Sequence, residues 1–276
     1  MSRVTTVIAT RDRWPDLTRS LPRHEPPVLL VDNGSTDGTP ALVRQHFPDV
    51  RVVELPGNLG AVARNLGARD AGTPYVAFAD DDSWWAPGAL DRAAEHFDAS
   101  PRLGLLAGRI LVGPEERLDP VCAEMAHSSL PADPALPGPA VLGFVACGAV
   151  VRREAHLAAG GFDDVVVFPG EEARLAIDLA TLGWGLSYVD DVVAHHHPSA
   201  TRDARADRRT AIARSRLLTD VMRRPWPVVA RTGWSLTTAG PAERRGVAQA
   251  LPRLRRALGR REVAPPAVEA ALRLLG

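Results

Sequence analysis

The sequence predicts an α/β fold in which a mostly parallel sheet is flanked by helices and followed by an arginine-rich helical tail. Four short, valine-rich runs lie in the first third of the chain, at 4–10, 28–32, 51–55 and 75–80. Continuous apolar runs are typical of strands buried on both faces of a parallel sheet. Helical stretches separate them, and this order indicates a doubly wound, Rossmann-like sheet with right-handed crossovers.

The helices between these strands are expected from their start signals and polarity. Thr39 and Pro40 form an N-cap and first-turn pair for a helix that runs to Phe47. Two further helices are expected at 60–71 and 87–99. Each would pack on the sheet and connect neighbouring parallel strands.

The pattern after residue 100 is less regular. Apolar runs predict strands at 103–112, 141–151 and 186–194, and a helix is expected at 171–182. Prolines between the first two of these strands predict a long loop over 113–140. Loops of that length are usually functional or mobile, so we expect this loop and the tail to close over substrates.

The charge divides the chain into two parts. All 33 basic residues are arginine. Residues 1–198 hold 16 arginines against 27 acids, whereas residues 199–276 hold 17 arginines against 6 acids. We therefore predict an acidic α/β domain at 1–198 that binds a cation, and a helical extension at 199–276. The extension could bind phosphates or anionic lipid, but packing against the acidic domain is the favoured interpretation. No nucleic-acid partner is expected.

The compartment is predicted from cysteines and apolar stretches. Cys122 and Cys147 form no CxxC pair, which favours reduced thiols in a cytoplasmic protein. The first residues run directly into a strand pattern, so no signal peptide is expected. The longest apolar stretch, 141–151, is too short to span a bilayer. We expect a cytoplasmic protein, peripheral at the inner membrane face if the tail binds lipid.

Carboxylates follow two of the predicted parallel strands. Asp32 ends the second strand, and Asp80, Asp81 and Asp82 end the fourth. The carboxyl ends of parallel strands share one edge of a sheet, where ligands bind. If the backbone stays extended, Asp80 and Asp82 point to the same side and offer hard oxygen ligands for Mg²⁺ or Mn²⁺. The alternative, an N-cap cluster for the helix at 87–99, would use only one aspartate.

Six segments resemble the motifs of one enzyme family, in the right order. They are VTTVIATRDR, VDNGSTDGT, NLGAVARNLGA, FADDD, GGFDD and GEEARLAIDLATLGW, and they cover roughly Val4 to His197. Together they are similar to the inverting family-2 glycosyltransferases with the GT-A fold. The resemblance implies transfer of a sugar from a nucleoside diphosphate donor, UDP-, dTDP- or GDP-linked, to an acceptor hydroxyl, with Mg²⁺ or Mn²⁺.

The resemblance assigns the nucleotide site to four residues of the first half. Thr10 and Asp12 match the loop that holds the nucleotide, and Asp32 matches an acid that hydrogen-bonds the base or ribose. Arg64 matches an arginine that approaches the nucleotide or its diphosphate. The alternatives are a local Asx-turn for Asp32 and a solvated helix arginine for Arg64.

The same resemblance assigns the residues of FADDDSWW. Asp82 matches the direct metal ligand of a DxD motif, and Asp80 matches an acid that contacts ribose or metal. Asp81 is also counted among the predicted nucleotide-binding residues, although its side chain is expected to point away from the nucleotide and to cap a helix. Trp84 and Trp85 are expected beside the donor sugar, and at least one of them is expected to pack in the core.

The base is expected on the helix at 171–182. Glu172 precedes an apolar stripe at Leu175, Leu179 and Leu182, so it faces the protein and is the predicted base. The family usually has an aspartate in its place and another where this chain has Arg174. The assignment between the two glutamates therefore stays open, and both could simply favour the helix N-terminus.

Glu171 falls on a different face of this helix. It shares that face with Arg174 and Asp178, so ion pairs are the expected role, with the acceptor site as the alternative. Three histidines follow the last predicted strand, and His195 best fits a metal-binding position of some relatives, with His197 on the same side. An amphipathic helix is expected at 206–224.

Two other function classes compete with glycosyl transfer. A sugar nucleotidyltransferase would need a glycine-rich loop after the first strand, where this chain has ATRDRWPD. A non-catalytic nucleotide-sugar-binding module would keep the fold without turnover. Neither the acceptor, the donor sugar nor the oligomeric state is predicted by the sequence.

Overall fold

A computed structural model describes residues 2–199 and 205–276 of the chain. Within these residues nine strands form one mixed sheet, in the order β3-β2-β1-β4-β8-β6-β9-β5, with β7 paired to β6. The strands are β1 Val4–Thr10, β2 Val28–Asp32, β3 Val50–Glu54, β4 Tyr75–Ala79, β5 Ser83–Trp85, β6 Leu103–Val112, β7 Arg117–Leu118, β8 Ala149–Arg152 and β9 Gly185–His196.

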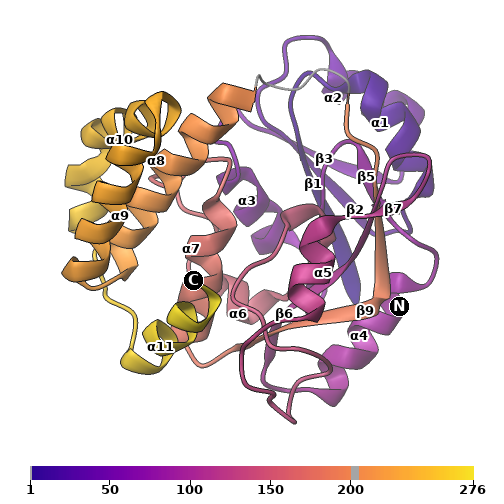
Figure 1. The fold of residues 1–276 in the computed structure, drawn as a ribbon. Helices are drawn as coiled ribbons and strands as arrows, with labels where there is room; N and C mark the ends of the chain where they lie inside the picture. The colour runs from indigo at the N-terminus through magenta and orange to yellow at the C-terminus, as the bar shows by residue number, and fades with distance from the viewer. Residues whose placement is uncertain (1, 200–204) are drawn as a thin grey trace.

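Helices cover both faces of this sheet, and four more follow it (Figure 1). The helices of the sheet domain are α1 Trp14–Ser20, α2 Thr39–His46, α3 Val62–Asp70, α4 Ala89–Ala99, α5 Pro120–Ala126, α6 Arg153–Ala158 and α7 Glu171–Thr181, with 3₁₀ turns η1 Leu21–Arg23 and η2 Ala146–Gly148. The C-terminal helices are α8 Arg205–Arg223, α9 Trp226–Ala239, α10 Pro241–Gly259 and α11 Pro266–Leu275. None of the described helices has the length and apolar character needed to cross a bilayer.

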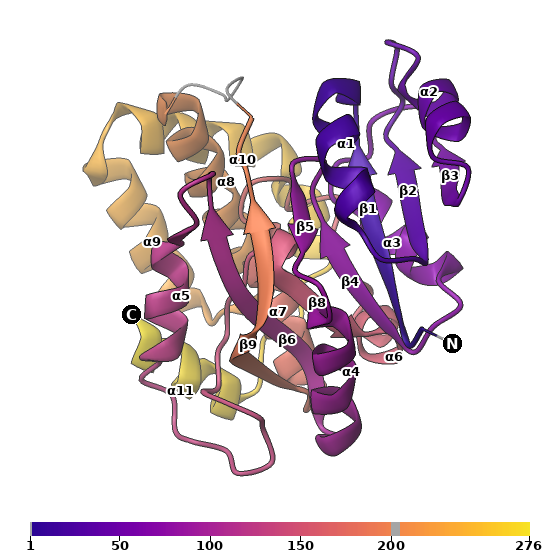
Figure 2. The ribbon, with the colours of Figure 1, turned by 90° about the vertical axis from the view of Figure 1, so that its right-hand side faces the viewer.

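The parallel half of the sheet agrees with the prediction. β3, β2, β1 and β4 are mutually parallel neighbours. The second half is mixed, because β8 is antiparallel to both β4 and β6, and β5 is antiparallel to β9. Since only three residues separate β4 from β5, an end strand of the sheet lies close to its middle and the sheet curls (Figure 2). This curl brings the turn after β4 close to the end of β9.

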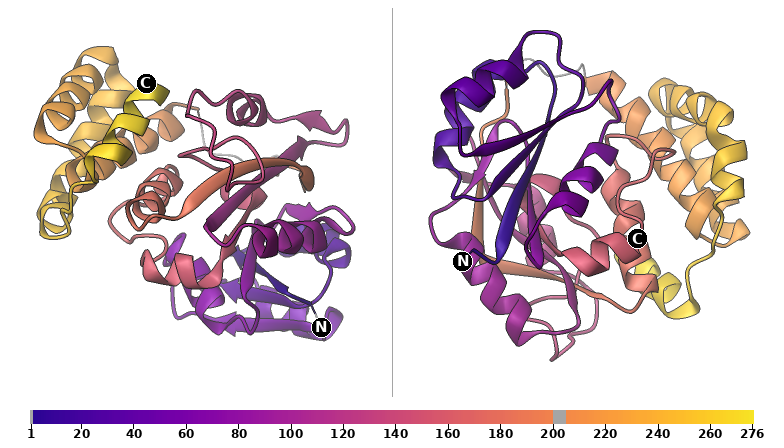
Figure 3. Two further views of the ribbon diagram at one scale, coloured as in Figure 1. Left: turned by 90° about the horizontal axis from the view of Figure 1, so that it is seen from below. Right: turned by 180° about the vertical axis from the view of Figure 1, so that it is seen from behind.

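The core lies in layers on either side of the sheet. One apolar cluster joins the sheet to α3, α6 and α7, and includes Phe78, Leu105, Leu175 and Leu179. On the other face α4 contributes Phe97 to a second cluster, while α1 and α2 pack over β1 and β2 in another. A separate cluster binds α8, α9 and α10 together as a helical layer beside the sheet domain (Figure 3).

Several predictions are wrong, most of them in the second half of the chain. Residues 113–140 are not one irregular loop, because they contain β7 and α5. The expected strand at 141–151 is mostly a buried loop with the turn η2, and only residues 149–152 form a strand. The prolines of the tail, Pro252 among them, are expected from the sequence to break its helices, but Pro252 lies inside α10 and does not break it. Thr39 is the first residue of α2 rather than its N-cap, which is Gly38.

Candidate active site

The three consecutive aspartates form the turn between β4 and β5. The backbone does not stay extended, because the Ser83 N–H donates to the Asp80 carbonyl oxygen at 3.2 Å and the Asp80 N–H donates to the Ser83 hydroxyl at 2.8 Å. The premise that Asp80 and Asp82 share one side of an extended strand is therefore wrong. Instead each carboxylate meets a different partner: Asp80 meets α3, Asp81 meets β1, and Asp82 meets the end of β9.

Asp80 pairs with a buried arginine of α3. Arg64 Nη2 lies 2.5 Å from Asp80 Oδ1, and Arg64 is 8% exposed. Burial alone would lower the pKa of Arg64, but the charges of Asp80, Glu171 and Glu172 raise it, and the net pKa lies above its usual value. The alternative of a solvated helix arginine is therefore wrong. Arg64 brings a fixed positive charge to a site otherwise rich in carboxylates.

Asp81 turns toward the end of β1. Its Oδ2 accepts a hydrogen bond from the Thr10 hydroxyl at 3.2 Å, and its carbonyl oxygen accepts one from the Ser20 hydroxyl at 2.7 Å. Burial, together with the charges of Asp80 and Asp82, raises the pKa of Asp81 to about 7. Helix α4 begins behind Gly88 with no side-chain cap, so the capping role expected for an aspartate is wrong.

Asp82 is held by the segment that follows β9. Its Oδ2 accepts a hydrogen bond from the Ser199 N–H at 2.9 Å, and His196 Nε2 lies 3.4 Å from its Oδ1. One ligand atom each of Asp80, Cys147 and His196 lies within 4.8 Å of the other two. His196 thus lies next to both Asp80 and Asp82.

His195, the predicted metal ligand, points to the other side of β9. It pairs in register with Trp84, its ring stacks on the Trp84 ring with centroids 5.4 Å apart, and its Nδ1 lies 3.3 Å from Glu116. Successive side chains of a strand face opposite ways, so His196 and His195 cannot share a site. The geometry therefore favours His196 over the predicted His195 as a metal ligand beside Asp82. The run of three histidines indicated that one of them lies near the metal site. Which one it is depends on the register between β5 and β9, which the sequence does not show.

The donor set suits a hard divalent cation. The carboxylates of Asp80 and Asp82 and the imidazole of His196 are ligands that Mn²⁺ accepts, and the carboxylates alone suit Mg²⁺. Cys147 is a poorer ligand, because burial and the charges of Asp80 and Asp82 raise the pKa of its thiol well above its usual value. Both cysteines are free and buried.

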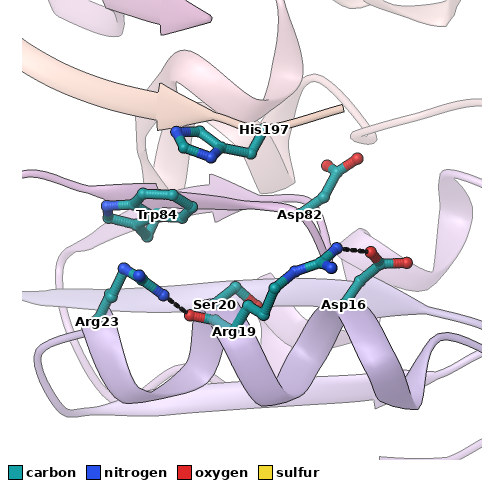
Figure 4. A pocket seen from close by; sticks show the side chains of 7 residues that line it. All are labelled: Asp16, Arg19, Ser20, Arg23, Asp82, Trp84 and His197. Atoms are coloured by element: carbon teal, nitrogen blue, oxygen red, sulfur yellow. Dashed lines mark hydrogen bonds and ion pairs between the residues drawn. The ribbon is translucent and has the colours of Figure 1, made fainter. Parts of the chain in front are cut away.

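The two tryptophans have different environments. Trp85 is buried, donates its indole N–H to the Phe78 carbonyl oxygen at 3.2 Å and packs in the core, as expected for at least one of the two, so it does not face a sugar site. Trp84 is half-buried and lines a cavity of about 50 Å³ with Asp16, Arg19, Ser20, Arg23, Asp82 and His197. Figure 4 shows Trp84 between His197 and Arg23, whose guanidinium lies 4.6 Å from the ring centroid. Arg23, His195 and His197 thus contact the ring, and part of the side chain stays exposed.

The loops after β1 and β2 are tied together. Asp32 accepts the Ser35 N–H at 2.9 Å as well as the Ser35 hydroxyl, so the local turn considered for it is present. Asp12 has a left-handed φ of 53° and accepts the Thr36 N–H at 2.7 Å, a bond that lowers the pKa of Asp12. Thr10 and Asp32 are register partners. The predicted nucleotide residues therefore meet at one edge of the sheet.

The two glutamates begin α7 on the far side of the cleft. Glu171 is 1% exposed, and neither of its carboxylate oxygens has a hydrogen-bond partner among the described residues. Burial and the charge of Glu172 raise the pKa of Glu171 to about 8. Glu172 is half-buried, and burial raises its pKa too. The ion pairs expected for Glu171 are absent from the described residues, because Arg174 pairs with Asp178 and Asp163 instead.

The C-terminal helices hold the segment that leads into α7. Gly170, with φ 103°, turns the chain into the helix, and a Cβ there would lie 3.2 Å from Ser215 of α8. The Ser215 hydroxyl donates to the Val167 carbonyl oxygen at 2.9 Å. Arg223 of α8 forms an ion pair with Asp178. The favoured interpretation, in which the basic tail packs on the acidic domain, agrees with these contacts.

Comparison with known sequences decides the family. Residues 7–158 match the profile of the family described as "Glycosyl transferase family 2". The chain belongs to this family. The family predicted from the motifs is confirmed, and so is the GT-A fold class.

Two curated relatives come from Mycobacterium tuberculosis. An N-acetylglucosaminyl-diphospho-decaprenol L-rhamnosyltransferase is 32% identical over 203 residues, which cover 62% of this chain and 66% of the relative. A pre-mycofactocin glycosyltransferase is 35% identical over 185 residues, which cover 64% of this chain and 38% of the relative. About a third of the rhamnosyltransferase and more than half of the pre-mycofactocin glycosyltransferase thus lie outside the matched regions.

Solved structures support the fold. The mannosyltransferase PcManGT from Pyrobaculum calidifontis, in complex with GDP-Man and Mn²⁺, has a TM-score of 0.61 at 23% identity and covers 99% of this chain and 85% of its own. TarS from S. aureus, in complex with UDP-GlcNAc, has a TM-score of 0.65 at 16% identity and covers 98% and 84%. At these identities the likeness shows a shared fold.

The family-2 match covers only part of the site. It includes Thr10, Asp32, Arg64 and the aspartate turn, but it ends at residue 158. The α7 glutamates and His196 lie beyond it and are placed in the cleft by the structure.

Proposed function

We propose that this family-2 protein is an inverting glycosyltransferase that moves a sugar from a nucleoside diphosphate sugar to an acceptor hydroxyl. The observation that carries the proposal is the turn Asp80–Asp82 beside buried Arg64 and His196. A carboxylate-rich turn with one fixed cation suits a metal-bound diphosphate better than a purely structural role, because three adjacent acids otherwise repel one another.

The donor would lie along the carboxyl edge of β1, β2 and β4. Asp12, Asp32 and Thr10 would hold the nucleotide, and Arg64 would face the diphosphate. Asp82 and His196, with Asp80, would hold Mg²⁺ or Mn²⁺, which when bound neutralises charge on the departing diphosphate. Trp84 would contact the donor with the part of its side chain that Arg23, His195 and His197 leave exposed.

Glu172 is the proposed base. It is half-buried, so an acceptor can reach it, whereas Glu171 is enclosed. A base works best when its pKa lies near the working pH, and burial raises the pKa of Glu172 in that direction. Glu171, with a pKa of about 8, is mostly protonated at neutral pH and keeps negative charge away from the acceptor.

The proposed acceptor is a lipid-linked sugar diphosphate. The M. tuberculosis rhamnosyltransferase is named for such a compound, an N-acetylglucosaminyl-diphospho-decaprenol. A lipid-linked acceptor would place the enzyme at the cytoplasmic membrane face, where the basic C-terminal helices could contact anionic lipid.

Calorimetric titration of UDP, dTDP and GDP, with and without Mn²⁺, tests the donor site. We expect one nucleotide to bind tightly with Mn²⁺, and Asp82→Ala to abolish the metal dependence. Asp70→Ala, which removes an exposed carboxylate paired with Arg51, is the matched control and should bind as the native protein does. If no nucleotide binds and Asp82→Ala behaves like the native protein, the turn has no such role.

Glu172→Gln separates an enzyme from a binding module. We expect this variant to bind nucleotide normally and to lose donor turnover, including slow hydrolysis, by at least about a hundredfold. If the native protein binds nucleotide sugar but releases no nucleoside diphosphate with any acceptor or water, the non-catalytic module is the better description. If Glu171→Gln loses turnover and Glu172→Gln does not, the base is Glu171.

A further inference from the structure

Helix α9 exposes large aromatic side chains on its outer half. Trp234 is 74% exposed, the highest fraction among the exposed large apolar residues of the described chain, and Trp226 is 55% exposed. With Ala230 they are spaced four residues apart, so all three lie on one side of the helix. The opposite side packs inward through Leu236 and through Thr232, whose hydroxyl donates to Asp220 at 2.6 Å.

The same outer half is basic. α9 contains no acidic residue, and Arg231 is exposed beside Trp234. The Arg261 guanidinium lies over the Trp226 ring, 4.1 Å from its centroid. On the neighbouring helix α10, which shares the apolar cluster with α9, Arg255 is also exposed. Neither Arg231 nor Arg255 forms an ion pair with a described residue.

Packing against the acidic domain accounts for other arginines. Arg223 pairs with Asp178, and Arg256 and Arg260 pair with Asp164. These pairs lie where the helical layer meets the sheet domain, whereas α9 lies on the outer side of that layer (Figures 1 and 3). The acidic domain thus pairs with arginines on the inner side of the layer, whereas Arg231 on the outer side has no ion pair with a described residue.

We propose that the outer face of α9, defined by Trp226, Ala230, Arg231 and Trp234, docks on an anionic lipid bilayer. Tryptophan rings partition to the headgroup level, and arginines beside them attract anionic lipid. A second copy of this chain fits the face less well, because a symmetric contact would bring Arg231 toward its own equivalent with no acid on α9 to compensate. The inference rests on the proposed function in one respect: a lipid-linked acceptor gives the contact a purpose.

Sedimentation with vesicles tests the docking face. The full chain is mixed with vesicles of phosphatidylcholine alone or with phosphatidylglycerol, and the bound fraction is measured. We expect binding only to the anionic vesicles, reduced about tenfold by Trp234→Ala and about as much by Arg231→Glu. Matched controls are Leu182→Ala, an apolar residue 51% exposed at the end of α7, and Arg117→Glu, an exposed arginine of β7; neither should change binding.

Each other outcome contradicts the docking face. Absence of vesicle binding, equal binding to neutral vesicles, or equal loss in the controls and the α9 variants would overturn it. A dimer in sedimentation equilibrium that Trp234→Ala dissociates would assign the face to a second copy instead. Nucleotide titration of the same Trp234→Ala protein keeps the two proposals apart, because normal nucleotide binding without vesicle binding refutes only the docking face.

Discussion

Asp178 is the point at which the C-terminal helices hold the helix that carries the two glutamates. Its carboxylate accepts hydrogen bonds from Arg174 of α7 and from Arg223 of α8, and the side chains of Asp178 and Arg223 are each 10% exposed. Removing one partner of a buried pair leaves a charge without compensation and costs about 3–5 kcal/mol. Because Arg174 still compensates Asp178, we expect Arg223→Ala to lower the free energy of unfolding by about 3 kcal/mol.

Thermal unfolding followed by circular dichroism measures this loss. A change of about 3 kcal/mol corresponds to a fall in melting temperature of roughly 6–12 °C for a chain of this size. The matched control is Arg209→Ala, whose ion pair with Glu243 joins α8 to α10 and whose side chain is 65% exposed; it should cost less than about 1 kcal/mol. A fall in Arg223→Ala no larger than in Arg209→Ala would refute the idea that a buried pair fastens α7 to the tail.

Three further predictions concern the core and the cleft. Gly67→Ala would place a Cβ 2.3 Å from Val7 Cγ1 and should destabilise the fold by about 2 kcal/mol, whereas Gly72→Ala, which meets open space, should not; urea unfolding compares them. Glu171, with a folded-state pKa of about 8 against an ordinary 4.5, binds a proton in the folded but not the unfolded chain at pH values between these two, so stability should fall as pH rises through that window. Asp81 and Glu172 also have raised pKa values, so melting temperatures of Glu171→Gln should show a shallower slope, and equal slopes in both proteins would contradict the assignment. Trp85→Ala should cost about 3–5 kcal/mol in melting experiments and Trp84→Ala much less, and comparable losses would mean that Trp84 also serves the core.

The parallel half of the fold could be predicted because its signals are local. Each of the strands β1, β2, β3 and β4 is a short apolar run, and each alternates with a helix. Helix α5 also had a local signal, since Asp119 precedes Pro120 and its side chain accepts the Val121 N–H at 3.0 Å. The prolines around it led to the expectation of a loop.

Other parts depend on contacts between distant residues. The segment 141–151 is apolar because it is buried, and its composition does not tell a strand from an enclosed loop. β5 has three residues and exists only through its pairing with β9, about 110 residues later. That pairing sets the orientation of the histidines, so the sequence could indicate a histidine near Asp82 but could not select His196.

The charge asymmetry of the chain connects the site to its surroundings. The acidic domain concentrates carboxylates in the cleft and also at Asp163, Asp164 and Asp178, and tail arginines pair with this second group. Within the cleft, Arg64 pairs with Asp80 and offsets the charge of that carboxylate. Since the tail fastens α7 from behind, a variant that weakens the Arg223 contact should also disturb catalysis through the position of Glu172, without touching the nucleotide.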